Sequence, residues 1–100
     1  MSQNEGTSLE TTVSEIVTRI EAKNAAREQA LSESRQLIRF AANSIRAIHR
    51  RENDQARSIL AQGQQRLETI KKVLAGYPEI YWAGHVQDAQ KEYAEARLTY

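Results

Sequence analysis

The sequence lacks several features that define common protein classes. It has no cysteine, which excludes disulfides and thiolate metal sites and suits a reducing compartment. One proline and four glycines are too few turn-forming residues for many short strands, so long helices are favoured. No apolar run could span a membrane, and the N-terminus has no basic segment followed by an apolar one. These absences predict an all-α, cytoplasmic protein with no signal peptide and no membrane partner.

An excess of charge of one sign is also missing. The 14 basic and 13 acidic residues leave a formal net charge of +1, so bulk charge does not direct the chain to nucleic acid or to a membrane. Any anionic partner has to be recognised by a local cluster of cations. The shares of hydrophobic (40%) and charged (27%) residues are those of a folded chain, and 100 residues suffice for one domain.

The spacing of apolar residues predicts three helices in a single helical domain, residues 8–100, after a polar flexible tail, residues 1–7. The first helix covers residues 8–50, which contain neither glycine nor proline, and its weakest point is the polar stretch around Asn24. A turn at residues 52–54 precedes the second helix, which Gly76 and Pro78 end. The third helix covers residues 78–100. The predicted fold is an antiparallel helical bundle with one long N-terminal helix and two shorter helices.

The predicted helices differ in length. The second and third each have about half the length of the first, by the common rise per residue. They therefore cannot cover its whole apolar stripe, and the part at residues 13–20 must meet the third helix, another chain or a further part of the protein. We expect a homo-oligomer or a missing C-terminal half.

Arginines recur on one face of the first predicted helix. At about 100° per residue, Arg35, Arg39, Arg46 and Arg50 fall within about 60° of one another, away from the apolar arc. Like charges four residues apart are unfavourable, so such a row suggests an anionic partner, and guanidinium groups match phosphate oxygens. The alternative is pairing with carboxylates of neighbouring helices, or simple solvation. Further cations that extend this path are His49, Arg51, Lys71 and Lys72.

Acidic residues recur on one face of the third predicted helix. His85, Asp88, Glu92 and Glu95 fall within about 80° of one another. Carboxylates on one face repel each other unless a cation compensates, and Mg²⁺ or Mn²⁺ prefers such oxygen ligands. A divalent ion held there could activate water for phosphodiester cleavage. The alternative is that these acids pair with the arginine row. The adjacent apolar arc, expected to pack, contains Trp82, Val86, Ala89, Tyr93 and Ala96.

Residues 35–100 resemble the translin family, which includes translin-associated factor X and archaeal relatives. Two segments carry the resemblance: RQLIRFAANSIRAIHRRE at 35–52 and YPEIYWAGHVQDAQKEYAEARL at 77–98. The second is the more specific. The resemblance implies an incomplete translin-like domain, because the family continues with further helices, one of which supplies another catalytic carboxylate.

The resemblance also implies a function. Translin-type bundles assemble into hollow oligomers, often octamers, and bind single-stranded RNA or DNA. Their nuclease-type subunits hold Mg²⁺ with a Glu-x-x-Glu pair, which corresponds here to Glu92 and Glu95 as metal-binding and catalytic residues. His85 corresponds to a nucleic-acid-contacting segment. Arg46, His49 and Arg50 are inferred phosphate contacts from the arginine row alone. We therefore expect a single-stranded nucleic-acid-binding protein that is a Mg²⁺-dependent endoribonuclease when complete. The alternative is a non-catalytic helical oligomerisation module.

Overall fold

The computed structural model describes the backbone of residues 2–100 and the side chains of residues 8–100. Four helices make up its regular structure: α1 (Ser2–His49), α2 (Asn53–Val73), α3 (Pro78–Tyr81) and α4 (Gly84–Thr99). The predicted all-α class with one long N-terminal helix is confirmed. The first helix begins ahead of its predicted start at Ser8 and continues without a break near Asn24. The flexibility predicted for residues 1–7 falls outside the residues whose side chains are described.

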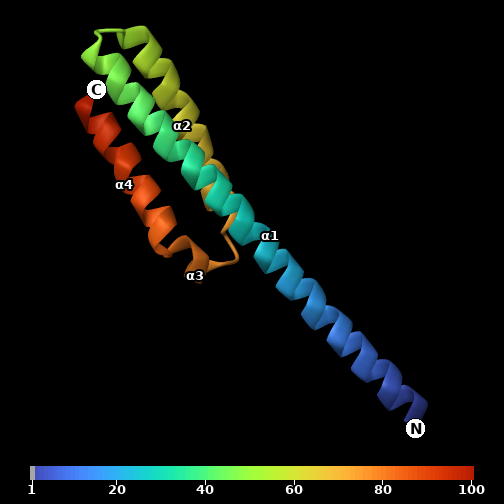
Figure 1. Ribbon diagram of the computed structural model, residues 1–100. Coiled ribbons are helices and arrows are strands. Elements are labelled where there is room, and N and C mark those ends of the chain that lie inside the picture. Colours follow the sequence, from blue (N-terminus) through green and yellow to red (C-terminus); the bar gives the residue numbers. More distant parts are fainter. Residues whose placement is uncertain (1) are drawn as a thin grey trace.

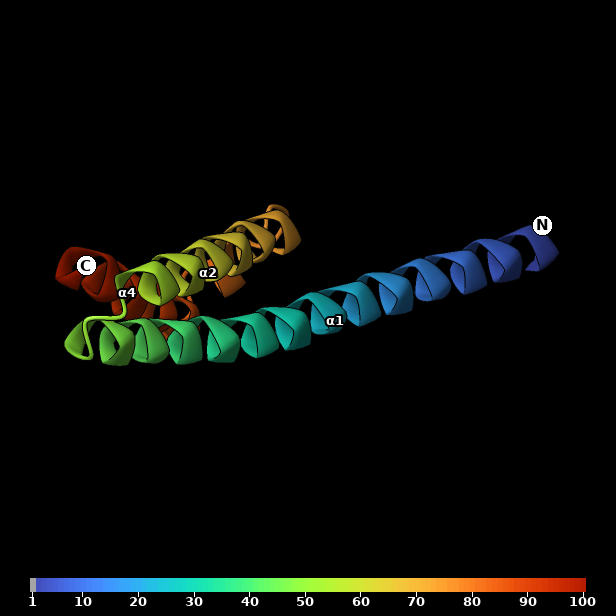
Figure 2. The same cartoon turned by 90° about the horizontal axis from the view of Figure 1, so that it is seen from above.

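The helices form a short bundle with one long projection. α2 runs back along the second half of α1, and α4 lies along α1 beside it (Figure 1). α2 and α4 both pack on α1 and touch each other little. The first half of α1 extends alone beyond the bundle (Figure 2). The radius of gyration is accordingly 19.8 Å, against about 13 Å for a compact chain of this length.

The turn between α1 and α2 reverses the chain with two backbone hydrogen bonds. The Arg51 N–H donates to the Ile48 carbonyl and the Glu52 N–H to the Ala47 carbonyl, both at 2.9 Å. This is the Schellman arrangement, which needs a left-handed residue after the helix end. Arg51 supplies it with a φ of 62°, a conformation that glycine adopts more readily.

Small residues of α1 line the centre of the bundle. Ala30, Ser34, Ala41 and Ser44 are each at most 1% exposed, and their small volume lets the neighbouring helices approach closely. The buried Ser44 hydroxyl donates a hydrogen bond to the Ala41 carbonyl of the same helix at 2.8 Å. The bulk of the core comes from larger side chains of all four helices: Leu37, Leu60, Ile70, Leu74, Ile80, Val86 and Tyr93.

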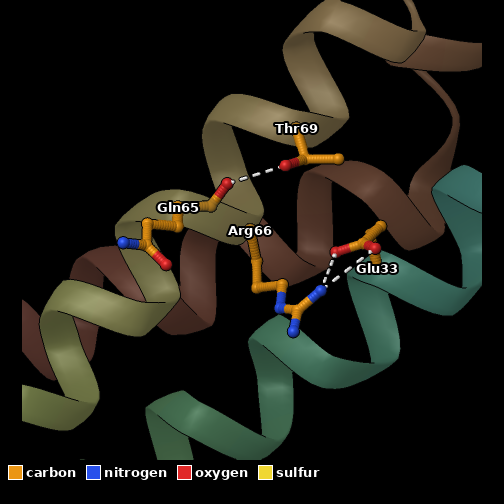
Figure 3. Close-up of polar contacts among 4 residues, drawn as sticks. All are labelled: Glu33, Gln65, Arg66 and Thr69. Atoms are coloured by element: carbon orange, nitrogen blue, oxygen red, sulfur yellow. Dashed lines mark hydrogen bonds and ion pairs between the residues drawn. The ribbon is translucent and has the colours of Figure 1, made fainter.

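One ion pair ties α1 to α2 near the core. Arg66 Nη1 donates to both carboxylate oxygens of Glu33, at 3.2 and 3.3 Å (Figure 3). Glu33 is 9% exposed, so its charge needs this partner. The Arg66 guanidinium also lies 6.0 Å from the centre of the Phe40 ring.

The predicted third helix is wrong as a single element, because the chain breaks it into α3 and α4. Ala83 is extended, with φ −66° and ψ 149°, and the Gln87 amide donates to the freed Tyr81 carbonyl at 2.7 Å. The break turns Trp82 outward to 70% exposure, so its predicted place on the packing face is also wrong. The rest of that arc is buried as predicted: Val86, Ala89, Tyr93 and Ala96.

Candidate nucleic-acid interface and metal site

The predicted arginine row lies on the outer face of α1. Arg35, Arg39, Arg46 and Arg50 are all exposed, while the core-facing side of the same helix is buried. Arg46 Nη1 donates to Asn43 Oδ1 at 2.8 Å, and Arg50 Nε lies 3.4 Å from Glu52 Oε1 in the following turn. Within the described residues, no carboxylate of another helix pairs with the row. The guanidinium groups therefore stay accessible to an anion.

The outer face of α1 also lacks acidic residues near this row. Between Glu28 and Glu52 the sequence has one acid, Glu33, and that side chain is buried against Arg66. The charged side chains exposed on the helix over this stretch are therefore all basic. An arginine face without interspersed carboxylates attracts a polyanion more strongly than a mixed surface does.

The four residues chosen as nucleic-acid contacts do not form one patch. Arg46, His49 and Arg50 lie at the end of α1, beside the turn to α2. His85 lies in the first turn of α4, which starts next to α3, whereas α4 ends near the α1–α2 turn (Figure 1). His85 is thus at the opposite end of the bundle. It is partly buried, and its Nε2 atom has no hydrogen-bond partner within the described residues.

The acidic row lies on the outer side of α4. Asp88, Glu92 and Glu95 are exposed, and the buried residues of α4 face the other way. None of the three ion pairs found in the described part of the chain involves this row, so the predicted alternative of arginine partners is not what the structure has.

Glu92 and Glu95 offer an incomplete set of metal ligands. They lie one helical turn apart on the same exposed face, and Mg²⁺ accepts one or two carboxylates together with water and phosphate oxygens. Across residues 8–100, no group of three or more metal-ligating side chains gathers in one place. The pair could therefore hold an ion only with ligands from water, substrate or residues outside this set.

Sequence reasoning missed a groove of about 290 Å³ between α2 and α4. Arg57 Nε donates to the Tyr100 hydroxyl at 3.1 Å, and this contact is the main cause that raises the pKa of Arg57. Arg97 Nη1 donates to Gln64 Oε1 at 3.4 Å. The groove lies near the α1–α2 turn and adds cations to the end of the bundle that carries Arg46 and Arg50. Arg57 and Arg97 belong to different helices, so no local spacing could have revealed it.

Comparisons with protein-family models, with curated proteins and with solved structures find no match for this chain. The resemblance to the translin family thus stays a prediction. No helix in the described residues has the length and apolar character needed to cross a membrane.

Proposed function

We propose that this protein binds single-stranded nucleic acid through the outer arginine face of α1, residues 35–50. The observation that supports the proposal is the exposed row of Arg35, Arg39, Arg46 and Arg50, in which Glu52 beside Arg50 is the only paired carboxylate among the described residues. A flexible single strand can follow such a row with its phosphates, and exposed arginines supply the charge-assisted hydrogen bonds. A cytoplasmic location, where RNA is abundant, belongs to the same proposal.

A narrower proposal is that the complete protein cleaves RNA with Mg²⁺ at Glu92 and Glu95. It rests on the resemblance to nuclease-type translin subunits and on the accessible pair of carboxylates. Mg²⁺ would supply Lewis-acid chemistry at the phosphodiester when bound. The two glutamates would orient it, and the remaining ligands would come from outside this pair. A homo-oligomer such as an octamer would be the translin-type assembly.

Binding is tested by titrating labelled single-stranded RNA and DNA at several salt concentrations. The variant Arg39→Gln/Arg46→Gln removes two charges from the row, and Arg19→Gln/Lys91→Gln removes two exposed charges elsewhere. The first should lower the slope of log affinity against log salt by about 1.4, which is 0.7 for each lost phosphate contact on a single strand. The control should bind like the parent. Equal slopes for both variants would refute the arginine face.

Cleavage is tested separately with Mg²⁺ and a single-stranded RNA substrate. Glu92→Gln/Glu95→Gln should abolish metal-dependent cleavage while leaving binding intact. The matched control, Glu15→Gln/Glu28→Gln, removes two exposed carboxylates from α1 and should cleave like the parent. Cleavage that persists in the α4 variant would defeat the catalytic assignment without affecting the binding proposal.

A second candidate function is a non-catalytic helical assembly module. The observation that favours it is the apolar stripe on the projecting half of α1, where five side chains are between 45 and 66% exposed. An apolar stripe of this length on a protein surface is characteristic of an interaction site. In this function the arginine face contributes nothing, and the salt titration above would show no specific binding.

A further inference from the structure

The projecting half of α1 carries an apolar stripe that nothing in the bundle covers. Its members are Leu9, Val13, Ile16, Val17 and Ile20, each close to half exposed or more. α2, α3 and α4 all lie beside the part of α1 that follows residue 22, where Lys23 pairs with Glu79 of α3 (Figures 1 and 2). The predicted alternative that the third helix covers residues 13–20 is therefore wrong. We call residues 8–22 the α1 arm.

The stripe is the continuation of a surface that is already an interface. Positions that recur every seven residues from Leu9 and from Val13 form one register along α1, which we call the heptad seam. In the bundle this seam includes Ala30, Leu37 and Ala41, which α2 and α4 bury almost completely. In the arm the same seam places Leu9, Val13, Ile16 and Ile20 outward. A repeat of 3.5 residues keeps a seam facing a partner helix, so the arm presents the pattern of a helix that lacks its partner.

We propose that the partner is a second copy of this chain, whose α1 arm packs against the first in antiparallel orientation. Residue numbers that face each other then add up to 29, which places Leu9 opposite the partner's Ile20 and Val13 opposite the partner's Ile16. This register makes four layers, and all four are apolar on both sides. Shifting it by one heptad toward the bundle would place Lys23 and Arg27 opposite Val13 and Leu9.

A parallel pair is disfavoured by charge and by space. A parallel pair in which equal residue numbers face each other would place Lys23 against the partner's Lys23 and Arg27 against the partner's Arg27 on the seam. Like charges in such layers are destabilising. The partner helix would also continue along the seam into the space that α2 and α4 occupy. In the antiparallel pair the two bundles lie at opposite ends and do not compete for the seam.

The arm needs little ordering to associate. It is continuous with the half of α1 that the bundle holds helical, so the costly first turn of helix is already formed. Preorganisation of this kind reduces the entropy lost on association. The inference deepens the second candidate function, assembly, and is independent of nucleic-acid binding.

Association is tested by sedimentation equilibrium of the whole chain between about 1 and 100 µM. The parent should form a dimer, and Ile16→Asp should raise the dissociation constant about a hundredfold or more because each dimer then buries two carboxylates. Thr18→Asp adds the same charge to the same arm away from the seam and should stay within about threefold of the parent. Circular dichroism verifies that the variants keep the helical bundle.

The direction is tested by disulfide exchange, because the chain has no cysteine of its own. Leu9→Cys and Ile20→Cys variants, which have equal masses, are mixed in a glutathione buffer. The disulfide-linked peptides are then identified by mass after tryptic digestion, because cleavage after Arg19 separates positions 9 and 20. An antiparallel pair gives mainly the mixed disulfide between the two variants, whereas a parallel pair gives only disulfides between identical variants.

A dimer that Ile16→Asp disrupts but that yields only disulfides between identical variants would overturn the antiparallel arrangement. Assembly through the arm would still hold in that case. A parent that is monomeric at 100 µM, or a dimer indifferent to Ile16→Asp, would overturn the inference and the assembly function of the arm together.

Discussion

At the scale of single residues, Gly63 marks a close approach between α2 and α4. A methyl group placed there would lie 2.6 Å from Tyr93 Cε1 and 3.5 Å from Leu37 Cδ1. The Tyr93 ring cannot swing away freely, because it is buried and its hydroxyl donates to the Leu60 carbonyl at 2.8 Å. Burial also raises the pKa of the Tyr93 hydroxyl, so it stays a donor across the ordinary pH range.

Gly63→Ala should therefore lower the free energy of unfolding. Alanine gains about 1 kcal/mol of helix propensity, and overpacking a core costs about 1–3 kcal/mol, so we expect a net loss of up to about 2 kcal/mol. Urea unfolding measures it. Gly84→Ala is the control, since its added methyl group meets nothing within 4 Å. A Gly63 variant more stable than the parent would contradict the packing described here.

A second prediction concerns Glu79 of α3, whose carboxylate lies 2.9 Å from Lys23 Nζ at the start of the bundle. The hydrogen bond from Lys23 lowers the pKa of Glu79 below its ordinary value. A lowered pKa contributes stability above the unfolded-state pKa, about 4.3, and the contribution is lost as the pH falls through the folded-state pKa. Lys23→Met should raise the pKa of Glu79 toward its ordinary value and weaken this pH dependence; the backbone hydrogen bond of Glu79, which also lowers its pKa, remains.

A carbon-detected NMR titration of the Glu79 carboxyl measures the change. Lys91→Met removes an exposed lysine of α4 and should leave the Glu79 pKa where it is in the parent. An unchanged Glu79 pKa in the Lys23 variant would argue against the contact between α1 and α3. Both groups are solvent-exposed, so the effect on unfolding is expected to be small.

Single residues also set the limit of what the sequence predicts. Ile38 belongs to the apolar pattern of α1 yet is 40% exposed, whereas the polar Ser34 and Ser44 are buried. Both serines lie on the heptad seam and Ile38 does not. Burial on α1 therefore follows position on the seam more closely than side-chain hydropathy. Glu92 and Glu95 could be placed on one exposed face from spacing alone. The absence of a third ligand beside them, in the described residues, depends on tertiary structure.

At the scale of elements, the break between α3 and α4 was the main feature that periodicity could not predict. Residues 82–84 include no proline, and Gly84 weakens a helix by about 1 kcal/mol without ending it. What stabilises the break is a contact across it, from the Gln87 amide to the Tyr81 carbonyl at 2.7 Å. The Tyr81 and Trp82 rings also meet in a T-shaped arrangement, with centroids 5.2 Å apart.

Gln87→Ala should lower the free energy of unfolding by about 0.5–1.5 kcal/mol, because the Tyr81 carbonyl loses its side-chain donor. Chemical denaturation measures the loss. Gln62→Ala is the matched control, since the Gln62 amide bonds only to a carbonyl of its own helix at 3.4 Å and is exposed. If both variants lose the same stability, the contact across the break contributes nothing of its own.

At the scale of the whole molecule, the structure divides α1 into a half that builds the bundle and a half that does not. The molecule is 74 Å long and 20 Å across, and the bundle accounts for roughly half of that length at the usual rise per helical residue. The mismatch in helix length was predictable from the sequence. The orientation of the uncovered stripe was not, because it depends on the register that continues from the bundle.

Removing residues 1–20 should leave the bundle intact. At concentrations where both forms are monomeric, the melting temperature should stay within about 4 °C of the parent, the shift that about 1 kcal/mol produces. Mean residue ellipticity should fall as the helical arm is lost. Differential scanning calorimetry measures the melting temperature. A drop of 10 °C or more would show that the arm stabilises the bundle.

Because α1 is one continuous helix, the proposed dimer holds its two arginine faces at a fixed distance from each other. The centre of the antiparallel pair lies between residues 14 and 15, so each Arg35 is roughly 30 Å from it and the two copies of Arg35 are roughly 60 Å apart. An oligonucleotide shorter than this gap can occupy only one arginine face at a time. A longer strand can bridge both, and the second contact then forms at high effective concentration. Affinity should therefore rise stepwise with strand length, and a rigid helix rather than a base sequence would set the threshold.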